Sequence, residues 1–160
     1  MAIHEMIGEL ISAPIQKRAI SNPDVLNEAC TYGSAFSRGM RLDLGDFVVL
    51  LISGTASIDE HGCTVHAGDL CAQTRRTFNN ITALLAAESA TWKDIVRTTC
   101  YLRDIERDYA AFNAERTAFY REQGLNPLPA STGIQATLCR PDLLVEIEAI
   151  AMFRRQRPTE

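Results

Sequence analysis

The chain has 160 residues and a formal net charge of −4, with 46% hydrophobic and 22% charged residues. These values are ordinary for a globular protein, and the length suits one domain with a substantial core. The acidic balance argues against a nucleic-acid partner, because phosphate binding needs a basic surface. No apolar run approaches the roughly 20 residues of a membrane span, so no membrane partner is expected.

The cysteine pattern bounds the compartment and the metal chemistry. The five cysteines are Cys30, Cys63, Cys71, Cys100 and Cys139. An odd count, no Cys-x-x-Cys pair and no secretory signal at the start indicate reduced thiols in a cytoplasmic protein. His61, Cys63 and His66 lack a second cluster of ligands elsewhere, so we expect neither a metal nor another cofactor.

Residues 1–30 are interpreted as an N-terminal extension, with a short amphipathic helix indicated around residues 7–11. We expect the domain itself to cover residues 31–155 and the last residues, 156–160, to form a polar tail. Apolar and polar residues alternate loosely along residues 35–44. The next segment, 47–52 (FVVLLI), is apolar on both faces, which predicts a central, buried strand.

Two helices are predicted on either side of a further strand. Asp69 is a favourable cap, and apolar residues at helical spacing predict a helix over residues 69–88. Residues 95–103 predict a strand. A second amphipathic helix then begins at Asp104 or Asp108 and ends before the next glycine and proline.

Residues 130–139 and 143–152 predict a closing hairpin around a turn at residues 140–142. In that hairpin Glu146 lies opposite Gln135 or Thr137, and a one-residue slip of register would reverse the faces. The full order is strand, strand, helix, strand, helix, strand, strand. It predicts an α+β two-layer sandwich, a mixed sheet with both helices on one face.

The last strand carries two carboxylates in an otherwise apolar segment. Because side chains alternate along a strand, Val145 and Ile147 share one face, while Glu146 and Glu148 point to the other. Buried carboxylates are costly unless they are paired or functional. We expect the same face to carry Arg97, Arg103, Ser131, Gln135 and Cys139. We interpret it as the wall of a pocket that another subunit of a homo-oligomer closes.

Each candidate residue has a structural alternative. Glu146 as a general acid needs a pKa raised by burial, and otherwise pairs with Arg97 or Arg103. Those two arginines are anion clamps or simple charge balance. Cys139 lacks a recognisable histidine to activate it, so it is a site residue or a small apolar group at a strand end. Ser131 and Gln135, likewise, either bind a ligand carboxylate or are ordinary surface polarity.

Four segments resemble the YjgF/RidA superfamily, whose members are also called L-PSP endoribonucleases. They are ISGTASID (52–59), HAGDLCAQTRRTFNNITALL (66–85), IVRTTCYLRD (95–104) and LLVEIEAIA (143–151). The resemblance implies a chorismate-mutase-like fold and a homotrimer with ligand sites in the clefts between subunits. It extends over roughly residues 33–153.

Two branches of that superfamily imply different chemistry. The imine deaminases carry an arginine directly after Pro-Ala, where it clamps the substrate carboxylate. Here Ser131 follows Pro129-Ala130, which argues against ordinary imine deamination. The C-terminal domain of chorismatases is similar in SGTASI, in His66-x-Gly68-Asp69 and in CRPDLLVEIEA (139–149). That similarity implies that Glu146 protonates an enolpyruvyl ether while Cys139 steers the intermediate, although chorismatases are about twice as long.

We therefore expect a trimer that binds a small carboxylated metabolite and performs chorismatase-like hydrolase or lyase chemistry. The expected catalytic residues are Glu146 and Cys139. The expected substrate-binding residues are Ser131, Gln135, Arg97 and Arg103. One alternative is a 2-imino or enamine acid deaminase with a different carboxylate anchor. Another is a non-catalytic ligand-binding or regulatory protein.

Overall fold

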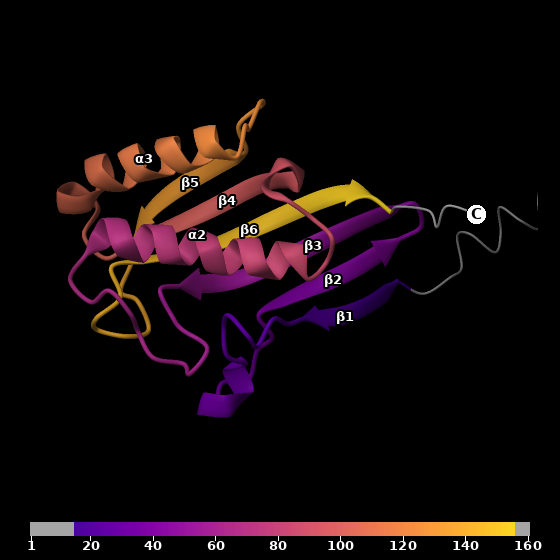
Figure 1. Ribbon diagram of the computed structural model, residues 1–160, viewed down its shortest axis with the longest axis horizontal. Coiled ribbons are helices and arrows are strands. Elements are labelled where there is room, and N and C mark those ends of the chain that lie inside the picture. The colour runs from indigo at the N-terminus through magenta and orange to yellow at the C-terminus, as the bar shows by residue number, and fades with distance from the viewer. Residues whose placement is uncertain (1–14, 156–160) are drawn as a thin grey trace, which may run out of the picture.

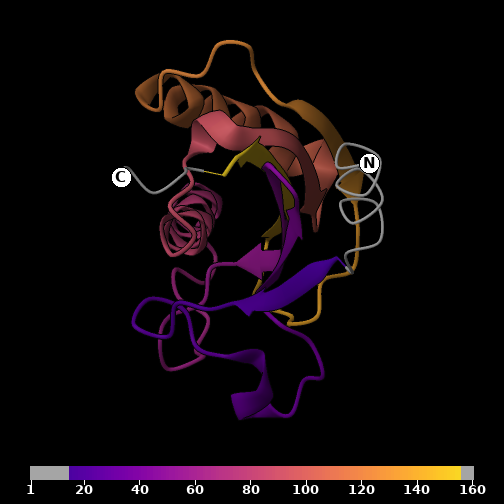
Figure 2. The same ribbon diagram turned by 90° about the vertical axis from the view of Figure 1, so that its right-hand side faces the viewer.

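The protein forms a six-stranded sheet with two long helices packed on one of its faces (Figures 1 and 2). The computed structural model describes residues 15–155. The strands are β1 (Gln16–Ile20), β2 (Gly39–Leu44), β3 (Phe47–Ala56), β4 (Ile95–Leu102), β5 (Ala130–Gln135) and β6 (Val145–Arg154), and the helices are α2 (Leu70–Ala86) and α3 (Ile105–Glu122). Short 3-10 helices cover Ala29–Tyr32 and Trp92–Asp94. The predicted α+β two-layer sandwich is confirmed.

The strand order is β1-β2-β3-β6-β4-β5, and β4 and β5 form the parallel pair of this mixed sheet. The predicted closing hairpin is wrong, because β6 pairs with β3 and β4 whereas β5 pairs with β4. Burial explains the placement. β6 buries Val145, Ile147, Ala149 and Ala151 and takes a central position, while every residue of β5 is exposed at the edge. β5 also ends at Gln135, not at residue 139.

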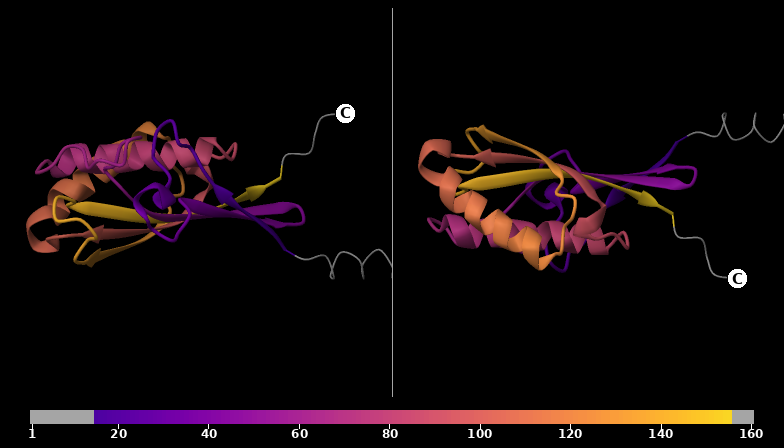
Figure 3. Two further views of the ribbon diagram at one scale, coloured as in Figure 1. Left: turned by 90° about the horizontal axis from the view of Figure 1, so that it is seen from below. Right: turned by 90° about the horizontal axis from the view of Figure 1, so that it is seen from above.

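The core lies between the helices and the sheet (Figure 3). Phe78 of α2 stacks on Phe119 of α3 with ring centroids 4.5 Å apart, and the buried Trp92 meets both rings edge-on. Asp69 caps α2 as expected, accepting a hydrogen bond from the backbone of Ala72. Of the two predicted starts for α3, Asp104 is the cap. These contacts fix both helices over one sheet face.

The sheet also takes in part of the expected extension, because β1 pairs with β2 along Gln16–Ile20. Arg18 of β1 forms an ion pair with the buried Glu88 that follows α2, which ties this strand to the helix layer. The helix expected around residues 7–11 and the tail at 156–160 lie outside the described residues. Within residues 15–155, no helix combines the length and apolar character that crossing a membrane requires.

Candidate functional site

The two carboxylates of β6 lie on the sheet face opposite the helices. Glu146 pairs with Tyr101 of β4, and Glu148 pairs with Thr99. Residues directly opposite each other in an antiparallel pair share a face, so Tyr101 joins the two glutamates. The intervening Ile147 is fully buried on the helix side. The predicted direction of both carboxylates is confirmed.

A bulge in β3 brings the backbone of the SGT segment against Glu146. Ile52 pairs with Ala149 and Thr55 pairs with Ile147, so β3 has one residue more than β6 over this stretch. Such a bulge bends the strand and redirects its neighbours. A Cβ atom on Gly54 would overlap with Oε1 of Glu146. Glycine is therefore required at position 54 for this carboxylate to lie against the strand.

Burial raises the pKa of Glu146, and the negative charge of Glu148 raises it further. No basic group of the described residues counters these two effects on Glu146. Desolvation also raises the pKa of Tyr101, with further contributions from Glu148 and Glu146. Glu146 thus keeps its proton to higher pH than an ordinary glutamate, which suits a group that exchanges protons with a ligand.

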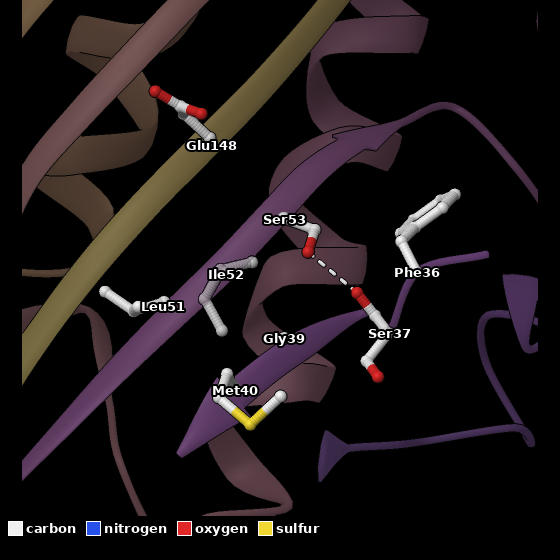
Figure 4. A pocket seen from close by; sticks show the side chains of 8 residues that line it. All are labelled: Phe36, Ser37, Gly39, Met40, Leu51, Ile52, Ser53 and Glu148. Atoms are coloured by element: carbon white, nitrogen blue, oxygen red, sulfur yellow. Dashed lines mark hydrogen bonds between the residues drawn. The ribbon is translucent and has the colours of Figure 1, made fainter. Parts of the chain in front are cut away.

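A cavity of about 340 Å³ opens beside Glu148 (Figure 4). It lies over β2, β3 and the segment before β2, and is lined by Phe36, Ser37, Gly39, Met40, Leu51, Ile52, Ser53 and Glu148. Within it, the hydroxyl of Ser53 donates a hydrogen bond of 2.7 Å to the carbonyl of Ser37. Its size and its mixture of apolar and polar groups are typical of a site for a small metabolite.

The two predicted arginines do not pair with these glutamates. Arg97 lies on the same face but is exposed, and its Nη2 donates to Oγ1 of Thr132 at 3.0 Å. Arg103 donates to the carbonyls of Leu143 and Arg140, so its guanidinium holds the loop before β6. Neither forms a salt bridge with another residue in the range 15–155. The charge-balance alternative for Glu146 therefore gains no support.

Ser131 and Gln135 point toward the helix layer, contrary to expectation. Because β5 runs parallel to β4, Ser131 is in register with Thr98, and its Oγ accepts hydrogen bonds from Thr98 and from Arg116 of α3. Gln135 accepts a hydrogen bond from the backbone of Ile105 at the start of α3. The predicted face was wrong because it took the apolar residues of this strand to face the helices, whereas Ile134 is 42% exposed and in register with Tyr101 on the open face. Neither side chain shares a pocket with Glu146 inside one protomer.

Cys139 lies exposed in the loop between β5 and β6, and its catalytic role stays a prediction. Three other residues were missed as site candidates: Gly54, Tyr101 and Arg116. Gly54 stands in a quoted motif, and Tyr101 lies two and four residues from Arg103 and Arg97, so the alternation that predicted their face also includes Tyr101. The sequence carries no comparable signal for Arg116. In the described part of the chain, no group of three His, Cys, Asp or Glu side chains is arranged to hold a metal ion.

The model of the family described as endoribonuclease L-PSP matches residues 30–153. The chain belongs to this family, the YjgF/RidA family. It is 34% identical over 113 residues to the 2-iminobutanoate/2-iminopropanoate deaminase of Salmonella typhimurium, which covers 71% of this chain and 84% of the relative.

Two further comparisons agree with this assignment. Identity to the 3-aminoacrylate deaminase RutC of Acinetobacter baylyi is 33% over 103 residues, 64% of this chain and 78% of the relative. The crystal structure of the Escherichia coli YjgF gene product superimposes with a TM-score of 0.68 at 27% identity, covering 84% of this chain and 97% of that one. The predicted chorismate-mutase-like fold is thereby confirmed.

Proposed function

We propose that this protein is a hydrolytic deaminase of small 2-imino or enamino carboxylic acids, with Glu146 moving the protons. The observation that carries the proposal is the half-buried carboxyl of Glu146, whose pKa is raised by burial and by the charge of Glu148. Glu148 in turn lines a cavity of metabolite size. The deaminase names of two relatives favour this chemistry over the chorismatase-like hydrolysis that the motif around Glu146 suggested.

The reaction adds water across a carbon–nitrogen double bond and releases ammonia. The carboxylate of Glu146 accepts a proton from water as the water oxygen bonds to the imine carbon. The resulting carboxylic acid returns that proton to the nitrogen, which gives a carbinolamine. Glu146 then takes the proton of the new hydroxyl group and passes it to the nitrogen as the carbon–nitrogen bond breaks, which leaves a 2-oxo acid and ammonia. An enamine is first protonated at carbon by the acid form. A raised pKa favours both transfers, because proton exchange is most efficient when the pKa lies near the working pH.

We further propose that the protein acts as a homotrimer whose subunits cover the open sheet face. Leu51, Ile134 and Met152 lie on that face and are 40%, 42% and 48% exposed. Apolar groups gathered on an uncovered sheet face favour burial against further copies of the chain. Such burial would remove more water from Glu146 and would complete the pocket. The five free cysteines favour the predicted cytoplasmic location.

The decisive experiment measures ammonia release from freshly generated 2-iminobutanoate, with pyruvate release from chorismate assayed in parallel. We expect the wild-type protein to accelerate ammonia release and to leave chorismate intact. Pyruvate release without ammonia release would support the chorismatase hypothesis instead. If neither substrate reacts but 2-oxobutanoate raises the melting temperature, the protein is a ligand-binding module without turnover.

A further inference from the structure

A second cavity, of about 360 Å³, lies on the helix side of the molecule. It is enclosed by the C-terminal half of α3, the segment that follows α3 and the start of β5. Its polar lining consists of Asn113, Arg116, Thr117, Tyr120, Arg121 and Ser131. No acidic residue lines it, although the whole chain has a net charge of −4. The cavity is therefore a basic site on an acidic protein.

Arg116 is held in place without a negative partner. Its Nη2 donates to Oδ1 of Asn113 at 2.7 Å, and its Nη1 donates to Oγ of Ser131 at 3.0 Å. The guanidinium carbon also lies 5.2 Å from the ring centre of Phe112. Both hydrogen-bond acceptors are neutral, and no carboxylate of residues 15–155 forms a salt bridge with this guanidinium. The guanidinium is therefore held in a fixed orientation, and its charge is not compensated. Its remaining N–H groups are available to an anion.

The neighbouring acidic residues are already used by other arginines. Arg75 of α2 pairs with Glu115 and Glu122 of α3. Arg107 pairs with Asp108 one helical turn from the start of α3. The charge of Arg116 therefore remains available to the cavity, because the nearest carboxylates on its own helix have partners elsewhere.

The groups around Arg116 complement a carboxylate with a short carbon chain. Ser131 accepts hydrogen bonds from Arg116 and Thr98, and its hydroxyl also lies 3.9 Å from Sγ of Cys100, a weak acceptor that a ligand oxygen can replace. The hydroxyl of Tyr120 is buried and has no well-aligned hydrogen-bond partner among the described residues. Leu125 and Leu128 supply apolar wall. One cation, nearby hydroxyl donors and an apolar wall are the features of a site for a small organic acid.

We infer that this cavity binds the carboxylate of a small 2-oxo or 2-imino acid, with Arg116 as its anchor. The identity of the acid rests on the proposed function, whereas the anion site rests on the cavity itself. Arg116 brings a guanidinium from the helix to the hydroxyl of Ser131, the residue that follows Pro129-Ala130.

The position of Glu146 adds a constraint. Ser131 points to the helix layer and Glu146 to the opposite face, with β4 between their strands. Within one protomer, a small ligand at Arg116 therefore does not reach Glu146. The two groups act on one molecule when Glu146 comes from a neighbouring copy, which the proposed trimer allows.

The test measures the dissociation constant of 2-oxobutanoate by titration calorimetry, with the neutral 2-oxobutanamide as a probe of the charge requirement. We expect Arg116→Gln to weaken 2-oxobutanoate binding about 10- to 100-fold, the usual cost of losing a hydrogen-bonded charge. The matched control is Arg18→Gln, which also removes an exposed guanidinium but lies in β1, where its partner Glu88 keeps Arg41 as a second partner. It should leave the affinity within about twofold, since that change is below the scale of one such hydrogen bond.

A double variant tests whether the position of the guanidinium matters more than the residue that carries it. Arg116→Gln combined with Ser131→Arg returns a guanidinium to the same place from the strand and should restore most of the affinity. Should Arg116→Gln lose its fold by circular dichroism, Arg116→Lys retains a charge without the planar fork and should bind with intermediate affinity. Wild-type protein that does not bind 2-oxobutanoate, or equal losses in Arg116→Gln and Arg18→Gln, would overturn the inference.

The anion-site inference and the deaminase proposal can be contradicted independently of each other. If wild-type protein releases ammonia and Arg116→Gln keeps both its KM and its affinity, the anion site is wrong and the deaminase function stands. If affinity depends on Arg116 while no ammonia is released, the anion site stands and the deaminase function is wrong.

Discussion

The two faces of the sheet carry cavities of similar size and opposite charge. The open face has about 340 Å³ beside Glu148, close to Glu146 and Tyr101. The helix side has about 360 Å³ around Arg116 and Arg121. The proposed proton-transfer group, Glu146, lies next to the first cavity on the open face, and the proposed anion anchor, Arg116, lines the second. The difference teaches that one protomer keeps the two groups on opposite faces of its sheet, so under the proposed function they act together only in an assembly of several copies.

The largest expected effect is a difference in kcat between variants of the two glutamates on the open face. Glu146→Gln should lower kcat for 2-iminobutanoate about 10²- to 10⁴-fold with little change in KM, because it removes the proton-transfer group. Glu148→Gln, a neighbour on the same face, should retain most activity, because it removes only a charge that raises the pKa of Glu146. Steady-state kinetics on both variants provide the measurement. Equal losses would show that the acid pair acts as a unit.

A second prediction concerns the contact between the bulge and the carboxylate. Gly54→Ala should lower kcat roughly 10- to 100-fold, because the added methyl group displaces the Glu146 carboxyl and small displacements of this kind are costly. The matched control is Gly133→Ala, whose new Cβ atom would meet its nearest neighbour at an ordinary 3.6 Å. The same kinetic assay distinguishes them. Full activity in Gly54→Ala would mean that the position of Glu146 does not matter.

The arginines of β4 and the following loop give a smaller effect, on stability rather than on activity. Arg103→Gln should lower the free energy of unfolding by about 1–3 kcal/mol, because two backbone carbonyls of the loop before β6 lose a charged donor. Arg97→Gln should change it little, since Arg97 is exposed. Urea denaturation measures both. Loss of 2-oxobutanoate binding with unchanged stability in Arg103→Gln would restore Arg103 as an anion clamp.

The smallest effect is a pH dependence of stability. The pKa of Glu146 is higher in the folded protein than in the unfolded chain, so the folded state holds this proton more tightly. Glu146 therefore costs stability as pH rises from its unfolded pKa through its folded pKa, and that cost is fully present above both. Relative to wild type, Glu146→Gln should raise the melting temperature more at pH 8 than at pH 4, probed by calorimetry. A gain at pH 4 equal to the gain at pH 8 would contradict the raised pKa.

Local periodicity was sufficient for much of the fold. The alternation along β6 correctly separated Glu146 and Glu148 from Val145 and Ile147, and helical spacing after Asp69 correctly predicted α2. The partner of β5 was not predictable in the same way. Adjacency in the chain favoured a hairpin, whereas the burial of β6 on its apolar side places it between β3 and β4. The partners of β5 and β6 depend on the arrangement of the whole sheet, which local sequence patterns do not contain.

The candidate site shows the same limit. Glu146 was identified from two carboxylates in an apolar strand, a signal contained in ten residues of sequence. The contact between Arg116 and Ser131 joins a helix to a strand that lie 15 residues apart along the chain. It depends on how α3 lies over β5, and no spacing rule indicates it. Gly54 likewise lies in a motif that the sequence analysis quoted. The reason it must lack a side chain is its contact with a carboxylate 92 positions later in the sequence.

The most direct test is a pH titration of the Glu146 side-chain carboxyl carbon by NMR, in wild-type protein and in Glu148→Gln. We predict a midpoint above that of an ordinary glutamate in the wild type, and a lower midpoint when the charge of Glu148 is removed. A wild-type midpoint at the ordinary value, unchanged by Glu148→Gln, would contradict a desolvated proton-transfer group on the open face.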